Sequence, residues 1–320
     1  MKHHITLIIF ALLTSFSAVA RAQSWKPQVV GVAPSAYDLQ FSPDGRWLLA
    51  TMGAGEGEDS SPMKAFDLTK RIKAREFDAT FAEFSPDSKT LVIFDRLSSE
   101  LKIVDLQNGK IQQRWKALTP QIAEGIDDVR FQKNGRELVV VTPFRIWRLD
   151  VQSGKKLSQT KIQIQAQESP HGFNGGFLLK DERRLLYING DEGYIYDVRT
   201  GKRRSKAEFG LLSHNEKWQW FYNAEVGQFW ISDFATGKDL WGAEFNDEPQ
   251  FSGDGRSLIV VDPKSGVRLL DPRTGKTRQH LKVPVPQPDI RGTNATYALS
   301  PDNNYWFARQ GDKILRTRLR

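Results

Sequence analysis

The chain has 320 residues, of which 39% are apolar and 26% charged, so it can bury a core of ordinary size and is too apolar for a disordered protein. Its formal net charge of +8 makes acidic partners conceivable and says more about solubility than about fold. It has no cysteine, which excludes disulfides, thiolate metal sites, thiol nucleophiles and a lipid anchor on cysteine.

The first 22 residues have the pattern of an export signal. Lys2 gives a positive start, residues 5–13 form an apolar run shorter than a membrane span, and small residues offer cleavage after Ala20 or Ala22. An uncleaved anchor is the weaker alternative, because a span usually needs about twenty apolar residues. We therefore expect a mature protein that is periplasmic or secreted, with no later membrane-spanning segment.

One turn motif recurs along the rest of the chain. The segment FSPDGR at Phe41 has six later relatives, and the anchors of these segments lie on average about 43 residues apart. A period in the forties with strand-like content is typical of a β-propeller. The later anchors are Phe84, Phe131, Leu179, Leu212, Phe251 and Leu299.

A second turn follows each of the first six anchors. The apolar runs between the two turns, such as LVIF and SLIVV, have no polar alternation, so we expect both faces of these strands to be buried. Two hairpins in each unit predict four strands for each blade. The second turns begin at Asp67, Asp105, Asp150, Asp197, Asp233 and Asp271.

The chemistry of these turns assigns their aspartates a structural role. In the first motif Pro43 presets φ, Asp44 suits the next position, and Gly45 accepts the left-handed conformation that closes the hairpin. In the second motif a glycine has the same task, and the leading aspartate can accept hydrogen bonds from turn amides. We therefore do not count these aspartates as catalytic.

The paired FSPDGR and D-x-x-T-G-K motifs resemble the WD40-like and YVTN-like β-propeller repeats of exported bacterial proteins. The resemblance covers nearly all of residues 25–320. It implies an all-β fold, a seven-bladed β-propeller of four-stranded antiparallel blades, as a single domain over residues 23–320. The last blade lacks an outer strand before Arg320, so we expect residues 25–32 to complete it and to remove an exposed edge.

The two faces of such a ring differ in chemistry. The repeated turns share one face and are rich in cations, with the densest cluster at Lys202, Arg203 and Arg204. This cluster is a candidate for peripheral contact with an anionic surface, although lysine and arginine are also simply soluble ways to end a hairpin. Nucleic acid is not an expected partner, because the sequence shows no basic helix and no aromatic-spaced binding strand.

The opposite face carries loops of irregular length, and we call it the irregular face. Loops on a rigid scaffold carry function more often than repeated turns do, so we expect a ligand or partner there. Residues 53–62 could bind calcium but lack the alternation of a dedicated calcium loop. The candidate binding residues are Glu56, Glu58, Asp59, Glu124, Asp127, Glu168, His171, Asp191, Asp289 and Arg291.

Two classes of function fit the sequence. The favoured one is a non-catalytic exported scaffold that binds an envelope protein or polymer, with no catalytic residue, metal or cofactor. The alternative is a propeller enzyme with its site in the central channel: residues 233–241 (DFATGKDLW) look like the tryptophan-docking repeat of quinoprotein dehydrogenases, and lactonase-type propellers are a further precedent. Only that repeat carries its tryptophan at that spacing, which favours the first class.

Overall fold

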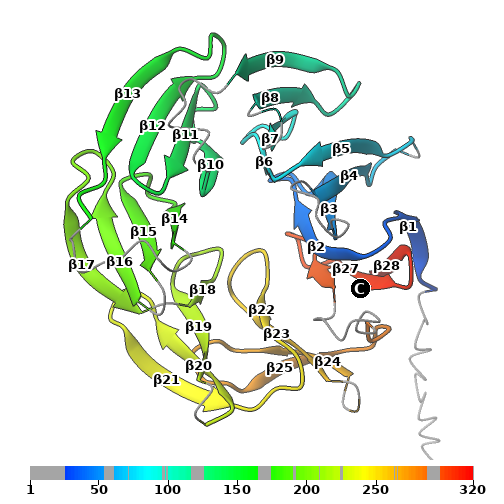
Figure 1. The fold of residues 1–320 in the computed structure, drawn as a ribbon. Coiled ribbons are helices and arrows are strands. Elements are labelled where there is room, and N and C mark those ends of the chain that lie inside the picture. The colour runs from blue at the N-terminus through cyan, green and yellow to red at the C-terminus, as the bar shows by residue number, and fades with distance from the viewer. Residues whose placement is uncertain are drawn as a thin grey trace, which may run out of the picture.

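The computed structural model describes residues 26–53, 61–70, 72–95, 98, 100–116, 126–164, 174–189, 192–208, 210–223, 226–262, 264, 266–286 and 296–319. These residues form seven four-stranded antiparallel sheets in a ring (Figure 1). The molecule is therefore a seven-bladed β-propeller, as the repeat pattern predicts. None of the described residues belongs to a helix that could cross a membrane.

The first four blades each consist of consecutive strands, numbered outward from the ring axis. Blade 1 has β2 (Ala36–Phe41), β3 (Trp47–Met52), β4 (Ser61–Asp67) and β5 (Arg75–Ala79). Blade 2 has β6 (Phe81–Phe84), β7 (Thr90–Asp95), β8 (Glu100–Asp105) and β9 (Ile111–Lys116). Blade 3 has β10 (Asp128–Phe131), β11 (Glu137–Thr142), β12 (Arg145–Asp150) and β13 (Lys156–Lys161). Blade 4 has β14 (Asn174–Leu178), β15 (Arg184–Asn189), β16 (Glu192–Asp197) and β17 (Arg203–Glu208).

The last three blades continue the pattern, and blade 7 borrows its outer strand from the N-terminal region. Blade 5 has β18 (Leu211–Leu212), β19 (Trp218–Asn223), β20 (Gln228–Asp233) and β21 (Lys238–Ala243). Blade 6 has β22 (Gln250–Phe251), β23 (Leu258–Asp262), β24 (Gly266–Leu270) and β25 (Thr277–Leu281). Blade 7 has β26 (Tyr297–Leu299), β27 (Tyr305–Gln310), β28 (Lys313–Arg318) and β1 (Gln28–Val32).

The ring is closed by pairing between the two ends of the described chain. Strand β1 runs antiparallel to β28, with Gln28 opposite Arg316 and Val32 opposite Lys313. The Arg316 guanidinium also donates to the side-chain oxygen of Gln28 at 2.9 Å. The expected closure by the N-terminal strand is therefore confirmed, and it covers the edge that β28 would otherwise expose.

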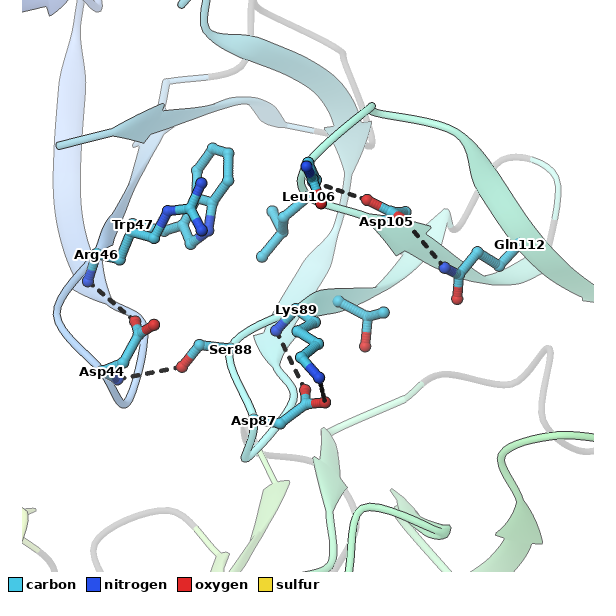
Figure 2. Close-up of a pocket in the computed structure, with 11 residues that line it drawn as sticks. Asp44, Arg46, Trp47, Asp87, Ser88, Lys89, Asp105, Leu106 and Gln112 are labelled. Carbon is cyan, nitrogen blue, oxygen red and sulfur yellow. Dashed lines mark hydrogen bonds and ion pairs between the residues drawn. The ribbon is translucent and has the colours of Figure 1, made fainter. Parts of the chain in front are cut away.

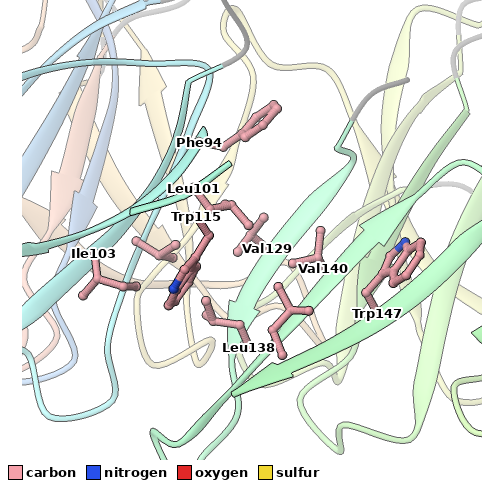
Figure 3. Packing of buried hydrophobic residues seen from close by; sticks show 10 residues of the cluster. Phe94, Leu101, Ile103, Trp115, Val129, Leu138, Val140 and Trp147 are labelled. Carbon is pink, nitrogen blue, oxygen red and sulfur yellow. The ribbon is translucent and has the colours of Figure 1, made fainter. Parts of the chain in front are cut away.

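The hydrophobic core lies between the blades. The buried residues form seven clusters, and each joins one blade to its neighbour, as Figure 3 shows for blades 2 and 3 around Trp115, Leu138 and Val140. Strand β11 shows why: Val139 and Val141 pack toward blade 4, whereas Leu138 and Val140 pack toward blade 2. An apolar run without alternation thus serves two interfaces at once.

The repeated turns are held by their own polar side chains. In the first motif the Asp44 carboxylate accepts from Ser42 Oγ at 2.7 Å and from the Arg46 N–H at 2.9 Å. In the second motif the Asp197 carboxylate accepts from the N–H groups of Arg199 and Thr200. The structural role assigned to these aspartates is confirmed.

The anchor of blade 4 lies one residue earlier than expected. Leu178, not Leu179, pairs with β15 at the position that Phe41 holds in blade 1, because the backbone of Leu179 makes the turn hydrogen bonds that Ser42 makes there. The assignment to Leu179 was wrong because the two adjacent leucines are indistinguishable in the sequence pattern.

The same turns also join neighbouring blades. Ser88 and Glu216 hold the left-handed position of their turns, and their side chains accept hydrogen bonds from the preceding blade, at 3.1 Å from Asp44 N and 2.5 Å from Lys180 N. On the outer rim, Trp241 Nε1 donates to the Pro272 carbonyl of blade 6 at 2.8 Å. The turn residues therefore both close their own hairpins and hold neighbouring blades together.

Candidate functional site

Most of the candidate loop residues are not placed by the structure. Asp127 is described, and so is the basic cluster. The other candidates lie outside the described residues: Glu56, Glu58, Asp59, Glu124, Glu168, His171, Asp191, Asp289 and Arg291.

Asp127 lies immediately before β10, at the N-terminal end of the inner strand of blade 3. Its backbone N–H donates to the Val141 carbonyl at 2.9 Å, whereas its Oδ2 is buried without a hydrogen-bond partner among the described residues. Burial raises the pKa of Asp127 to about 7, and the neighbouring Asp128 carboxylate adds to the shift against a hydrogen bond from Gly176. Asp127 is thus a partly desolvated carboxyl group that titrates near neutral pH.

A cluster of charged and amide side chains lies on the inner strands of blades 1 to 3, which are nearest the ring axis in Figure 1. We call Gln40, Glu83, Asp128 and Arg130 the axial cluster. Gln40 Nε2 donates to Glu83 Oε2 at 3.2 Å, which links blade 1 to blade 2. Arg130 Nε donates to Asp128 Oδ2 at 3.0 Å, and the Leu178 N–H of blade 4 donates to the same oxygen at 2.9 Å.

The electrostatics of the axial cluster follow from its enclosure by the ring. Burial raises the pKa of Glu83 to about 7, although the charge of Arg130 and the Gln40 amide favour the carboxylate. Burial also raises the pKa of Asp128 against the attraction of Arg130. The cluster therefore combines the cation of Arg130 with two carboxyl groups, Glu83 and Asp128, whose pKa values are raised.

Basic side chains extend this polar region toward the face of the repeated turns. Burial lowers the pKa of Lys180, and the charges of Arg130 and Lys133 act in the same direction. Burial likewise lowers the pKa of His214, with Lys180 and Arg130 adding to the shift. Lys133, Lys180 and His214 all stand where Pro43 stands in the first turn motif, so blades 3 to 5 replace a rigid apolar residue by a basic one.

Sequence reasoning missed the axial cluster, although a signal is present. Gln40, Glu83 and Arg130 each directly precede the aromatic anchor of their blade. A polar residue at that position of an inner strand faces the axis, where it meets its counterparts from neighbouring blades. Among the described residues, no group of three or more His, Asp or Glu side chains has the arrangement of a metal site.

The basic cluster of blade 4 is partly engaged within its own blade. Arg204 forms an ion pair with Asp197, which leads the second turn of this blade. The Arg203 guanidinium lies over the Tyr194 ring, 5.0 Å from its centroid. Lys202 is exposed at the end of the same turn. Two of these three cations therefore stabilise the hairpin that carries them.

A polar groove of ≈ 440 Å³ lies between blades 1 and 2 on the face of the repeated turns (Figure 2). Arg46 and Asp44 line one side, and Asp87 and Lys89 line another. Each of these carboxylates accepts hydrogen bonds from its own turn, at 2.9 Å from the Arg46 N–H and 3.1 Å from the Lys89 N–H. The groove is therefore lined by groups that already satisfy one another.

Exposed aromatic side chains lie on the irregular face of blades 1, 3 and 5. Within the described part of the chain three large aromatic residues are exposed: Tyr37 by 55%, Phe144 by 43% and Tyr222 by 54%. Tyr37 is the second residue of β2, the inner strand of blade 1, and Phe144 lies in the hairpin between β11 and β12. Tyr222 is the second-last residue of β19. All three positions are on the irregular face.

Comparison with known proteins supports the architecture. No protein-family model and no curated protein matches the chain. Among solved structures, it is similar to the β-propeller domain of Cps50 (Swd1) from Myceliophteria thermophila, a WD40-type propeller, with a TM-score of 0.60 and 10% identity over 92% of this chain and 100% of that chain. At this identity the likeness shows the fold alone. This chain matches 1251 solved chains, and a fold so widely shared does not define an activity.

Proposed function

We propose that this protein is an exported, non-catalytic propeller that binds an envelope protein or polymer through its irregular face. The observation that carries the proposal is the location of the exposed aromatic residues Tyr37, Phe144 and Tyr222 on that face. Exposed aromatic side chains are enriched where proteins bind partners, because they offer large contact area at little conformational cost.

The other features of the ring agree with a scaffold role. On the repeated-turn face, polar groups of the turns bond to one another within and between blades, as at Asp44, Ser88 and Glu216. Trp241 is the residue that suggested a quinoprotein. Its Nε1 donates a hydrogen bond to the Pro272 carbonyl, so this side chain links blade 5 to blade 6. Trp115 also packs against the turn glycine of the next blade, Gly154, as Trp241 packs against Gly275, but Trp115 Nε1 has no hydrogen-bond partner among the described residues.

Site-specific crosslinking tests the binding face. A photoreactive amino acid is placed at Phe144, at Tyr222 or, as a control, at Leu157, which is 53% exposed on the outer strand of blade 3. In the cells that make the protein we expect discrete adducts from the first two positions and none from Leu157. Equal labelling at all three positions, or labelling at Leu157 alone, contradicts the proposal.

The export part of the proposal has its own test. Residues 1–22 carry the signal pattern, so we expect the full chain in the periplasmic or secreted fraction and the chain without these residues in the cytoplasm. Recovery of both forms from the same fraction contradicts export. Peripheral contact with an anionic surface through Lys202, Arg203 and Arg204 is tested by sedimentation with anionic vesicles.

A further inference from the structure

Blade 5 exposes three large apolar side chains toward the ring axis and the irregular face. Leu211, Tyr222 and Val226 are exposed by 56%, 54% and 53%. Leu211 is paired with Trp220, and Tyr222 follows two residues later on the same strand, so these side chains point to the same side of the sheet. We call Leu211, Tyr222 and Val226 the blade 5 patch.

Aromatic rings beneath the patch hold Tyr222 in place. The ring centroid of Tyr222 lies 4.9 Å from that of Phe229, and Phe229 lies 5.9 Å from Phe245. Phe245 in turn contacts the Trp241 ring edge-on at 6.4 Å. Because Trp241 is fixed by its bond to Pro272, the exposed ring sits on a rigid support and loses little freedom on binding.

The connection between blades 5 and 6, which carries Phe245 of the ring stack, is rich in carboxylates. Residues 244–248 include Glu244, Asp247 and Glu248, and both glutamates are exposed. Hydrogen bonds to blades 6 and 7 hold this connection: Tyr297 Oη donates to the Glu248 carbonyl at 3.2 Å, and Asn246 Nδ2 donates to Asp262 at 3.0 Å. The backbone of this acidic connection is thus held in place next to Phe245, while the chain as a whole is basic.

We propose that the blade 5 patch docks a protein segment in which one large apolar side chain is flanked by lysine or arginine. The inference rests on the proposed function and adds the chemistry of the partner. The apolar side chain packs on Tyr222 and Val226, where it is removed from water. The flanking cations face Glu244 and Glu248, which favours encounter and selects against acidic segments.

The first test uses two synthetic peptides. One has a leucine with two lysines on each side, and the other has glutamates in place of the lysines; both carry a fluorophore for polarisation measurements. We expect the basic peptide to bind at least about 10-fold more tightly than the acidic one and to weaken as salt is raised. Equal affinities, or tighter binding of the acidic peptide, overturn the inference.

Variants locate the binding on blade 5. Tyr222→Ala and the double change Glu244→Gln with Glu248→Gln should each weaken binding of the basic peptide about 10-fold or more. Leu157→Ala, on the outer strand of blade 3, should leave it unchanged. Thermal melts show that each variant is folded. Unchanged binding with Tyr222→Ala, or equal loss of binding with Leu157→Ala, overturns the inference.

The outcome also separates this inference from the proposed function. If crosslinking at Phe144 captures a partner and crosslinking at Tyr222 does not, the irregular face binds but the blade 5 patch is not the site. If a soluble oligosaccharide binds in place of the basic peptide and Tyr222→Ala abolishes that binding, the patch recognises a polymer and the protein-segment inference is wrong.

Discussion

The indole of Trp115 lies directly over Gly154, where the outer strand of blade 2 meets the second turn of blade 3. A β-carbon added at Gly154 would lie 2.2 Å from a carbon of the Trp115 ring. The backbone of Gly154 is also left-handed, with φ of 67°. The position thus requires glycine both for its conformation and for the approach of the next blade.

Gly154→Ala is expected to lower the free energy of unfolding by about 3 kcal/mol or more, because strain in the left-handed region adds to displacement of a buried tryptophan. Gly237→Ala is the matched control. Gly237 holds the same turn position in blade 5 with φ of 66°, and nothing lies within 4 Å of an added β-carbon. It should cost about 1 kcal/mol. Urea unfolding of both variants measures how much of the destabilisation at Gly154 comes from packing between blades and how much from turn strain. Equal losses of unfolding free energy in the two variants would show that packing between blades contributes nothing.

Removal of residues 23–34 is expected to lower the melting temperature by more than about 10 °C, because β28 loses its partner strand and the junction of blades 7 and 1 opens. Gly31→Val tests the same contact without a deletion, since a β-carbon there would lie 2.1 Å from the Phe66 ring. Val29→Ala is the control, because Val29 is 57% exposed on the same strand. An unchanged melt after the deletion would show that the ring does not depend on this closure.

Asp67→Asn is expected to cost about 2 kcal/mol at pH 7 and close to nothing at pH 2. Burial opposes ionisation of Asp67, but hydrogen bonds from Arg46 and Thr69 outweigh it and hold the pKa at about 2, below the ordinary 3.8. A lowered pKa stabilises the folded state above the unfolded value, and this contribution is lost as the pH falls from 3.8 toward 2. Urea unfolding at the two pH values measures the difference.

The control for Asp67→Asn is Asp105→Asn. Asp105 leads the same turn in blade 2 and accepts from the Gln107 N–H at 2.7 Å, but its second oxygen meets the Gln112 amide in place of an arginine. We expect this change to cost about 1 kcal/mol or less, since no ion pair is lost. Equal costs at both sites would mean that the ion pair to Arg46 contributes nothing beyond the turn itself.

The fold could be predicted because its information is local and repeated. Each hairpin is specified by a few turn residues, such as Pro43, Asp44 and Gly45. The number of copies along the chain predicts how many blades pack together. The pairing of β1 with β28 followed from counting strands. The error at Leu179 arose where two adjacent leucines fit the anchor equally well and the turn lacks the serine that follows the anchor in five of the other blades.

The candidate site could not be predicted to the same extent, because its contacts join residues that are distant in the chain. Gln40 and Glu83 are 43 positions apart, and their hydrogen bond exists only because two blades are neighbours at the axis. Each residue alone reads as an ordinary polar position before an aromatic anchor. The loops of the irregular face have no repeat, so no rule relates Asp127 to the other candidates there.

Glu83 is expected to make the stability of the ring depend on pH near neutrality. Its pKa is about 7 in the folded protein against an ordinary value of 4.5, so the folded state holds a proton that the unfolded chain releases. The protein therefore loses stability as the pH rises from 4.5 through 7, and the full loss persists above 7. Glu83→Gln keeps the shape of the side chain and removes this titration.

Urea unfolding at pH 5 and pH 8 measures the effect. Relative to the unmodified protein, Glu83→Gln should be more stable by about 1–3 kcal/mol at pH 8 than at pH 5. Other groups, including Asp128, Arg130 and His214, are present in both proteins, so their direct contributions largely cancel in the comparison. Glu76→Gln, which changes a carboxylate that is 60% exposed, provides the background. If Glu83→Gln shows the same difference between the two pH values as Glu76→Gln, the axial carboxyl group is ionised without cost and Arg130 fully compensates for its burial.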